Sequence, residues 1–176
     1  MAVTSQTTYP GDDVVPDAAM VYNRRRIIRA SKEDIFPWLV QLGKGRGGWY
    51  MSKSCERFVS KSSRATRQIH PEWQNLQPGM VVEDYGFGKE EFVTVSSLSA
   101  PDSLVYVADR YGTRFTWALL LKSISEEETE VHLRFRGQME KTGLAKKMIV
   151  RGGDVIDWAF TEPLLTGLAE RVEKGC

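Results

Sequence analysis

The spacing of hydrophobic residues predicts a helix directly after Ser31. Hydrophobic side chains then recur at the intervals of one helix face, at Ile35, Trp38, Leu39 and Leu42. Ser31 is followed three positions later by Asp34, which resembles an N-cap with its acidic partner. Pro37 is expected in the first turn, where proline is tolerated, and Gly43 is a natural C-terminal stop. A second short helix is predicted from Ser52, over Glu56, Arg57, Phe58 and Val59.

Segments rich in β-forming residues surround these helices. One strand is predicted before them, at residues 21–30, and five after them, at residues 80–85, 91–98, 103–109, 114–121 and 129–139. Turn signals such as Pro101-Asp102 and Tyr111-Gly112 separate the later strands. Such short connections between consecutive strands favour an antiparallel meander.

The last segment predicts one long helix over residues 154–174. Its hydrophobic stripe is widened by Leu165 and Ala169 and consists of Ile156, Phe160, Leu164, Leu168 and Val172. Pro163 lies inside this pattern and predicts a kink or a boundary between two helical pieces. Asp154 is expected to cap the start of the helix. The order of elements predicts an α+β fold, in which a curved antiparallel β-sheet of six to seven strands grips the long C-terminal α-helix.

Composition adds limits to this picture. The chain has 176 residues, with 41% hydrophobic and 27% charged, which suits one domain over residues 21–176 preceded by an irregular arm, residues 1–20. The net charge of +1 gives no bulk attraction to nucleic acid or to an anionic membrane, and Arg24-Arg25-Arg26 fits the charged rim of a strand. No apolar stretch approaches the roughly 20 residues of a membrane span, and the N-terminus lacks a secretory pattern. We therefore expect a cytoplasmic protein, a monomer or homodimer, with Cys55 and Cys176 as reduced thiols.

Residues 43–48 read Gly-Lys-Gly-Arg-Gly-Gly, a literal G-x-G-x-x-G. A dinucleotide fingerprint needs a strand before these glycines and a helix after them, so that the phosphates meet a helix N-terminus. Here the glycines follow a helix C-terminus. We therefore expect them to form a sharp backbone turn beside Trp49 and Tyr50.

Two runs of residues carry a resemblance to a known superfamily. The stretch from Ile35 through Gly43 to Tyr50 resembles the first-helix motif of START-like helix-grip proteins, also called the SRPBCC or polyketide cyclase/dehydrase-like superfamily. Further matches are Leu76 with Pro78-Gly79-Met80, the Trp117/Leu119 pair, residues 133–136 and residues 167–171. The resemblance covers roughly residues 20–173. It implies the same gripped-helix fold with an internal cavity, whereas it leaves the reaction open because the superfamily includes both carriers and cyclases.

No metal and no cofactor are expected. The only histidines are His70 and His132, in different elements, and Cys55 stands alone. Acid–base chemistry in an apolar cavity is the remaining option. The candidate catalytic residues are Glu83, Arg136, Tyr50, Asp157 and His70. The candidate ligand-binding residues are Trp49, Arg46, Tyr85, Phe87, Tyr106, Phe115, Trp117, Arg134, Phe135 and Trp158.

Each of these candidates has an alternative role that the sequence leaves open. The aromatic residues can be core. In the strand 129–139, Val131, Leu133 and Phe135 share one face and the two arginines share the other, so Arg134 and Arg136 can be solvated or ion-paired outside the cavity. Only one of Glu83 and Asp84 can face inward, Arg46 can brace the loop, and His70 can lie on the surface.

Two functions follow. The first is a cofactor-free enzyme that folds an apolar, polyketide-like or aromatic small molecule and assists its cyclisation, dehydration or isomerisation. The second is a non-catalytic carrier or sensor of a lipid or hydrophobic metabolite. A protein–protein module with a filled cavity is a weaker third option.

Overall fold

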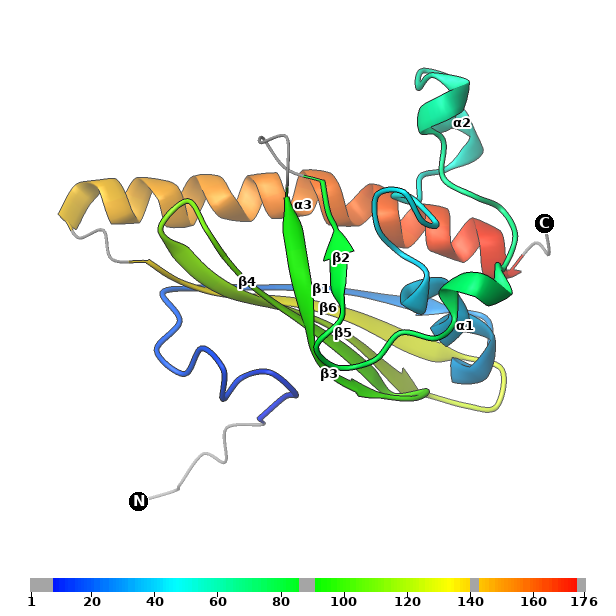
Figure 1. The fold of residues 1–176 in the computed structure, drawn as a ribbon, viewed down its shortest axis with the longest axis horizontal. Coiled ribbons are helices and arrows are strands. Elements are labelled where there is room, and N and C mark those ends of the chain that lie inside the picture. The colour runs from blue at the N-terminus through cyan, green and yellow to red at the C-terminus, as the bar shows by residue number, and fades with distance from the viewer. Residues whose placement is uncertain (1–7, 86–90, 140–142, 174–176) are drawn as a thin grey trace.

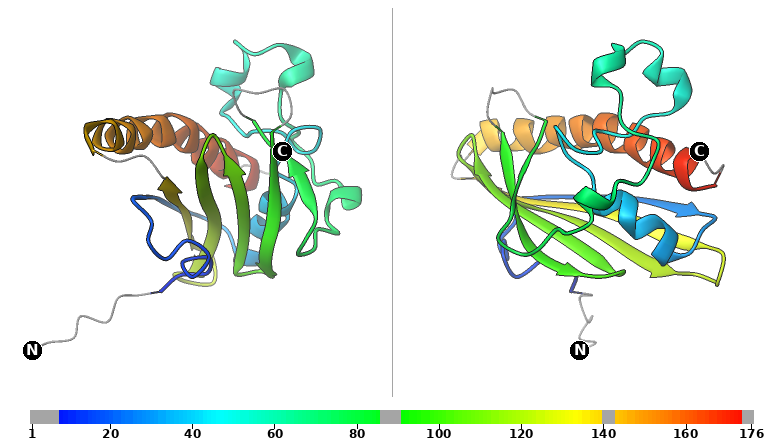
Figure 2. Two further views of the ribbon diagram at one scale, coloured as in Figure 1. Left: turned by 60° about the vertical axis from the view of Figure 1, so that its left-hand side comes forward. Right: turned by 45° about the vertical axis from the view of Figure 1, so that its right-hand side comes forward.

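The chain folds as one curved sheet with a long helix across its concave side (Figure 1). The computed structural model describes residues 8–85, 91–139 and 143–173, with side chains in the last range from Arg151 onward. Two further views show the strands curving beneath the helix (Figure 2). The predicted α+β architecture with a gripped C-terminal helix is confirmed.

Six strands form the sheet in the described part of the chain, in the order β1-β6-β5-β4-β3-β2. They are β1 (Met20–Ile28), β2 (Val81–Glu83), β3 (Phe92–Ser99), β4 (Ser103–Arg110), β5 (Thr113–Ser123) and β6 (Thr129–Met139). Every neighbouring pair is antiparallel. Strands β2 to β6 form the predicted meander, and β1 closes the order by pairing with β6.

The first helix, α1 (Lys32–Val40), begins where its cap predicts. The Ser31 hydroxyl oxygen accepts a hydrogen bond of 3.1 Å from the Asp34 backbone N–H and donates one of 2.7 Å to the Asp34 carboxylate. Pro37 is the sixth residue of α1 and not in its first turn, because the helix starts at Lys32. The glycine segment that follows closes on itself through a bridge between Gly43 and Gly48, so the predicted sharp turn is present.

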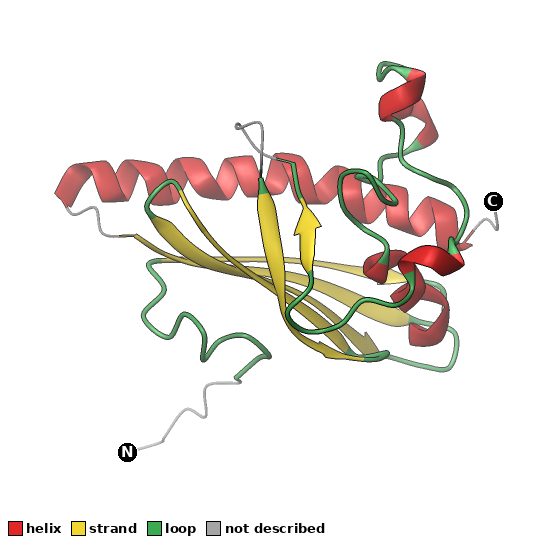
Figure 3. Cartoon of the chain, in the orientation of Figure 1, coloured by secondary structure: helices red, strands yellow, loops and turns green. Residues whose placement is uncertain are grey.

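Two predicted helix boundaries are wrong. Helix α2 (Lys53–Glu56) spans only four residues, so Phe58 and Val59 lie beyond it, followed by the short 3-10 helices η1 (Lys61–Ser63) and η2 (Pro71–Trp73). The last helix, α3 (Gly143–Glu173), begins eleven residues before Asp154 and continues through Pro163 (Figure 3). Asp154 is therefore inside the helix and does not cap it. The hydrophobic stripe begins only near Ile156, so it carried no signal for the earlier turns.

The hydrophobic stripe of α3 has two different environments. Its C-terminal half is core, since Leu164, Leu165 and Leu168 are each only 1% exposed. Its N-terminal half is not, because Ile156 and Phe160 are 52% and 51% exposed. The hydrophobic core therefore encloses only the C-terminal half of this stripe, and the side chains of the other half border open space.

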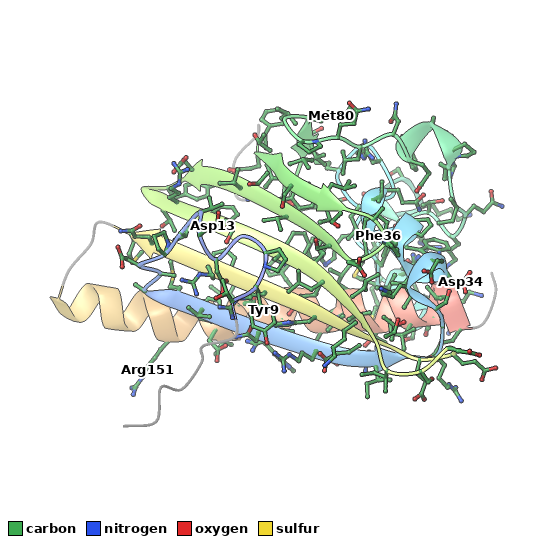
Figure 4. The ribbon with its side chains drawn as sticks, turned by 90° about the horizontal axis from the view of Figure 1, so that it is seen from below. Tyr9, Asp13, Asp34, Phe36, Met80 and Arg151 are labelled. Carbon is green, nitrogen blue, oxygen red and sulfur yellow. The ribbon has the colours of Figure 1, made fainter. Side chains whose placement is uncertain are left out.

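The segment before β1 covers the face of the sheet opposite α3. Figure 4 shows Tyr9 and Asp13 on a loop that crosses this face. The Asp12 carboxylate receives hydrogen bonds from Arg134 at 2.8 and 3.1 Å, and Arg136 donates to the Val15 carbonyl at 2.9 and 3.1 Å. These contacts bury polar side chains of β6 beneath the segment.

Candidate functional site

A cavity of about 760 Å³ lies between the concave side of the sheet and the N-terminal half of α3. Its walls come from the glycine segment, the strands β3 to β6, α3 and the loop after α2. The side chains that line it are mostly aromatic or aliphatic: Trp49, Met51, Val59, Tyr85, Val93, Tyr111, Phe115, Trp117, Phe135, Ile156, Ala159, Phe160 and Pro163. The polar ones are Ser63, Asp84, Arg110, Asp157 and Thr161.

Stacked aromatic rings form one wall of the cavity. Trp49 stacks on Trp117 with ring centroids 5.5 Å apart, and Trp117 stacks in turn on Tyr106 at 6.1 Å. The Trp49 indole N–H donates to the Phe160 carbonyl of α3 at 3.1 Å, so it links the glycine segment to the helix. Phe115 and Phe135 form a second stacked pair at 5.2 Å. These interlocked rings give the ligand space a rigid apolar surface.

A polar cluster lies at the sheet edge of the cavity. The Arg110 guanidinium donates to Asp84 at 2.8 Å and to Glu91 at 3.0 Å, and lies 5.0 Å from the Phe115 ring centre. The Tyr111 hydroxyl also hydrogen-bonds to Glu91. Tyr111 adopts a left-handed backbone with φ of 55°, which is uncommon for a residue with a side chain. Because Arg110 is held by two carboxylates, this edge does not offer a free cation to a ligand.

A second carboxylate reaches the cavity from α3. Asp157 is 13% exposed, and its Oδ2 lies 3.1 Å from Arg24 Nε. Arg24 is shared with Asp154, whose Oδ1 is 2.5 Å from Arg24 Nη2. Burial raises the pKa of Asp157 to about 6, and Arg24 opposes this while the charge of Asp154 adds to it. Asp157 can therefore both accept and return a proton near neutral pH.

Six of the residues predicted from the sequence line this cavity: Trp49, Tyr85, Phe115, Trp117, Phe135 and Asp157. Their elements are far apart in the chain and meet only because the sheet curves toward α3. Phe87, another predicted ligand-binding residue, lies outside the described residues.

Tyr50, Arg46 and His70 lie elsewhere. Tyr50 is fully buried and donates to the Trp38 carbonyl at 2.7 Å, and burial raises its pKa. Arg46 folds back onto the Val40 carbonyl at 3.1 Å, at the C-terminus of α1, where a cation is favourable. His70 lies in a loop, with its ring nitrogens 2.9 Å from the Thr66 hydroxyl and 3.2 Å from Glu72. Tyr50 is thus a core residue, Arg46 braces the loop and His70 lies in a surface loop, and none of the three lines the cavity.

Glu83 forms an ion pair with Lys44, while its neighbour Asp84 faces the cavity. Alternation along the strand thus puts the second of the two acidic side chains inside. Arg134 and Arg136 lie on the opposite face of the sheet from the cavity, where both approach Asp12. They are ion-paired under the N-terminal segment, because they share a face of β6 with His132 and not with Phe135.

Tyr106 and Trp158 do not line the cavity. Tyr106 is 2% exposed and lies behind Trp117. It faces a separate hollow of about 10 Å³, and its hydroxyl has no hydrogen-bond partner among the described residues. Trp158 is 56% exposed on the outer side of α3.

Several lining residues were missed by sequence reasoning. Tyr111 belongs to the predicted Tyr111-Gly112 turn, and Arg110 directly precedes it, outside the predicted strand 103–109. The sequence pattern places Ile156 and Phe160 in the hydrophobic stripe of the helix and predicts only a kink or boundary at Pro163. The predicted hairpin was the available clue, because a short turn between β4 and β5 places the residues at the end of β4 on the edge of the sheet.

The described residues contain no group of three or more His, Cys, Asp or Glu side chains that could hold a metal ion. Nor does any helix in that part of the chain combine the length and hydrophobicity needed to cross a membrane.

Comparison with solved structures places the fold among known proteins. A protein of unknown function from Staphylococcus aureus is 11% identical with a TM-score of 0.56, over 88% of this chain and 94% of its own. A hypothetical protein from Helicobacter pylori is 13% identical with a TM-score of 0.54, over 98% and 99%. The di-domain ARO/CYC StfQ from the steffimycin biosynthetic pathway is 12% identical with a TM-score of 0.53. The match covers 93% of this chain and 54% of StfQ.

At these identities the likeness shows the fold alone. No protein-family model matches the sequence, and the comparison with curated proteins gives no match. The chain therefore has the fold of a domain found in an ARO/CYC protein and in proteins of unknown function.

Proposed function

We propose that this protein binds an apolar, aromatic or polyketide-like small molecule in the cavity beneath α3 and assists its cofactor-free cyclisation, dehydration or isomerisation. The observation that carries this proposal is the combination of a large aromatic-lined cavity with one carboxyl group, Asp157, whose pKa is raised to about 6. We also propose that the chain belongs to the START-like superfamily that its sequence motifs resemble. The ARO/CYC title of one structural neighbour supports the reaction class as an analogy of fold.

The size and lining of the cavity indicate the kind of ligand. Its volume of about 760 Å³ falls in the range of small-molecule sites, roughly 300–1,000 Å³. Its stacked indole and phenyl rings favour planar, apolar ligands of two to three fused rings or their linear precursors. Tyr111 and Phe160 are partly exposed and lie at the cavity opening, so a ligand can enter between the β4–β5 turn and α3.

Asp157 supplies the acid–base chemistry. As a carboxylate it can remove a proton from a carbon next to a carbonyl group, which leaves an enolate that attacks a second carbonyl of the same molecule. The protonated Asp157 can then return its proton to the alkoxide that forms, which gives a hydroxyl group. In a second cycle Asp157 can remove another proton from the carbon next to the carbonyl and pass it to this hydroxyl, which leaves as water while a C=C double bond forms. The aromatic walls hold the reacting carbons together, which supplies much of the rate gain.

A non-catalytic carrier is the alternative. It is favoured by the small number of polar groups in the cavity and by the engagement of Arg110 with Asp84 and Glu91, which leaves little to stabilise enolate charge. The two functions share the ligand and differ in the role of Asp157.

Binding is tested first, with 2-naphthol as the probe. Quenching of Trp49 and Trp117 fluorescence should report saturable binding. Ala159→Phe introduces a bulky ring at a position that lines the cavity and should weaken binding at least about tenfold. Val155→Phe places the same side chain one helical turn earlier, at a position that is 64% exposed and does not line the cavity, and should leave binding unchanged. If the two variants bind 2-naphthol with equal affinity, the ligand binds outside this cavity.

Catalysis is tested next. Native mass spectrometry of protein purified from its own host identifies a bound small molecule. If that molecule is converted on incubation, and Asp157→Asn retains binding but loses conversion by a factor of about 100 or more, the enzyme is supported. If the molecule stays intact with both proteins, the carrier is supported.

A further inference from the structure

The loop after the glycine segment projects from the body of the protein. It comprises residues 52–66, called the basic loop below, and contains α2 and η1. Figures 1 and 2 show it standing away from the sheet, beyond α3, in every view. Its base is held in place, because buried Glu56 accepts hydrogen bonds from Arg171 at 2.6 Å and from Arg67 at 2.8 Å. The projection is therefore a built feature with an anchored base.

The most exposed large hydrophobic side chain of the described residues lies in this loop. Phe58 is 93% exposed, whereas the next most exposed, Tyr111, reaches 66%. A phenylalanine in water costs free energy that the fold does not recover by packing. Because Phe58 lies on a convex projection, a flat or yielding surface can cover it without any groove.

Positive charge surrounds Phe58. The basic loop holds four of the 24 cationic residues and one of the 23 acidic residues, so it carries +3 while the rest of the chain carries −2. The four cations, Lys53, Arg57, Lys61 and Arg64, are all exposed, and none forms an ion pair with a described carboxylate. The single acid, Glu56, is 5% exposed and paired with arginines. The outer surface of the loop is thus purely cationic among its charged groups.

We propose that the basic loop docks the protein on an anionic lipid surface, with Phe58 inserted among the lipids and the four cations at the headgroups. An exposed apolar side chain ringed by Lys and Arg is the combination that binds such interfaces. A nucleic acid is a poorer fit, because single strands bind in grooves lined by several stacking rings and this projection offers one. The net charge of +1 for the whole chain does not reveal this local concentration of positive charge, because the rest of the chain carries −2.

Docking would also serve the cavity. Val59 and Ser63 of the basic loop line it, and the exposed Phe58 and Lys61 lie one and two residues from them in the chain. Lipid contact at the loop therefore brings this wall of the cavity close to the membrane, which shortens the path of an apolar ligand through bulk water. This last step rests on the proposed function, whereas docking itself does not.

The test is co-sedimentation of the full-length protein with phosphatidylcholine vesicles that contain or lack phosphatidylserine. We expect binding only to the anionic vesicles, weakened by added salt. Each cation near an anionic surface contributes about fivefold in affinity, so Arg57→Ser/Lys61→Ser should bind roughly 25-fold more weakly. Phe58→Ser should bind about tenfold more weakly. These positions are exposed, and circular dichroism melting confirms that the variants fold.

Matched controls come from the far parts of the surface. Lys122→Ser/Arg151→Ser removes two exposed cations, and Ile124→Ser removes a hydrophobic side chain that is 50% exposed; both should bind vesicles like the wild type. An environment-sensitive fluorophore on Cys55, in a Cys176→Ser background, should shift to the blue when anionic vesicles are added. Loss of vesicle binding equally in the controls, no vesicle binding at all, or binding of a single-stranded oligonucleotide in its place would overturn the proposal. Loss of 2-naphthol binding with vesicle binding intact would count against the proposed function alone.

Discussion

Gly167 of α3 lies so close to Met51 that a β-carbon on the glycine would be 2.4 Å from the Met51 backbone nitrogen and 2.6 Å from its Cα and carbonyl carbon. Backbone atoms cannot move aside as a flexible side chain can. The contact joins the C-terminal half of α3 to the segment that leads into the basic loop, next to the Arg171 hydrogen bond to the Met51 carbonyl at 3.0 Å.

Gly167→Ala should therefore destabilise the protein. Alanine normally favours a helix by about 0.5–1 kcal/mol over glycine, but here the helix must shift away from Met51, and we expect a net loss of about 2–3 kcal/mol in the free energy of unfolding. Gly152→Ala is the matched control in the same helix, because nothing lies within 4 Å of its added carbon. It should be neutral or slightly stabilising in urea unfolding. An equal effect of both substitutions would contradict the close contact.

Asp157→Asn should stabilise the protein at alkaline pH. The folded-state pKa of Asp157, about 6, lies above the usual value of 3.8, so its ionisation costs stability. Protonated Asp157 therefore contributes its full share of the folding stability below about pH 3.8, and this share is lost as the pH rises through about 6. The asparagine variant should gain about 1–2 kcal/mol at pH 8 and nothing at pH 4. Arg24 retains Asp154 as a partner. Urea unfolding at the two pH values measures the gain.

His132 should make the protein sensitive to acid. It is 3% exposed, and burial, with help from Arg25 and Arg134, lowers its pKa from 6.5 to about 4. A lowered pKa means that the unfolded state binds the proton more readily, so stability is lost as the pH falls from about 6.5 to about 4. Over this pH range the free energy of unfolding of His132→Gln, measured with urea, should fall by about 2 kcal/mol less than that of the wild type.

The comparison between wild type and His132→Gln cancels the opposite effect of Asp157, which both proteins share. Gln can still donate to Asn23, the partner of His132 at 2.8 Å. Parallel pH profiles for the two proteins would assign the acid sensitivity to other groups, such as the ion pair of Asp12 with Arg134.

The cavity should discriminate ligands by charge. Its charged lining groups are two carboxylates, Asp84 and Asp157, and one guanidinium, Arg110, which Asp84 and Glu91 already hold. We expect 2-naphthol and a naphthylmethylammonium ion to bind at least about tenfold more tightly than 2-naphthoate at pH 8, because a carboxylate would meet like charge at low dielectric. Asp157→Asn should reduce this difference in affinity between 2-naphthoate and the other two ligands. Tightest binding by 2-naphthoate would show that Arg110 is free to pair with ligands. Fluorescence quenching measures all three.

The sequence by itself determined the elements and their order. The cap at Ser31, the stripe from Ile156 to Val172 and the alternation of Val131, Leu133 and Phe135 are local patterns, and local backbone and solvent preferences decide them. These patterns were sufficient to predict a curved sheet around a C-terminal helix, and to place Trp117, Phe135 and Asp157 as candidates for its cavity.

Only the tertiary structure decided which candidates meet. Arg134 and Arg136 are ion-paired outside the cavity because Asp12, more than a hundred residues away in the chain, packs over them. Asp84 and not Glu83 lines the cavity because of the orientation of the short strand β2. The same stripe of α3 is core at Leu164 and cavity wall at Phe160, because core side chains fill the space beneath one end of the stripe and leave a cavity beneath the other. Hydrophobic periodicity reports which face leaves water. Whether that face meets side chains or an empty space is set by distant segments packing together, which no local pattern records.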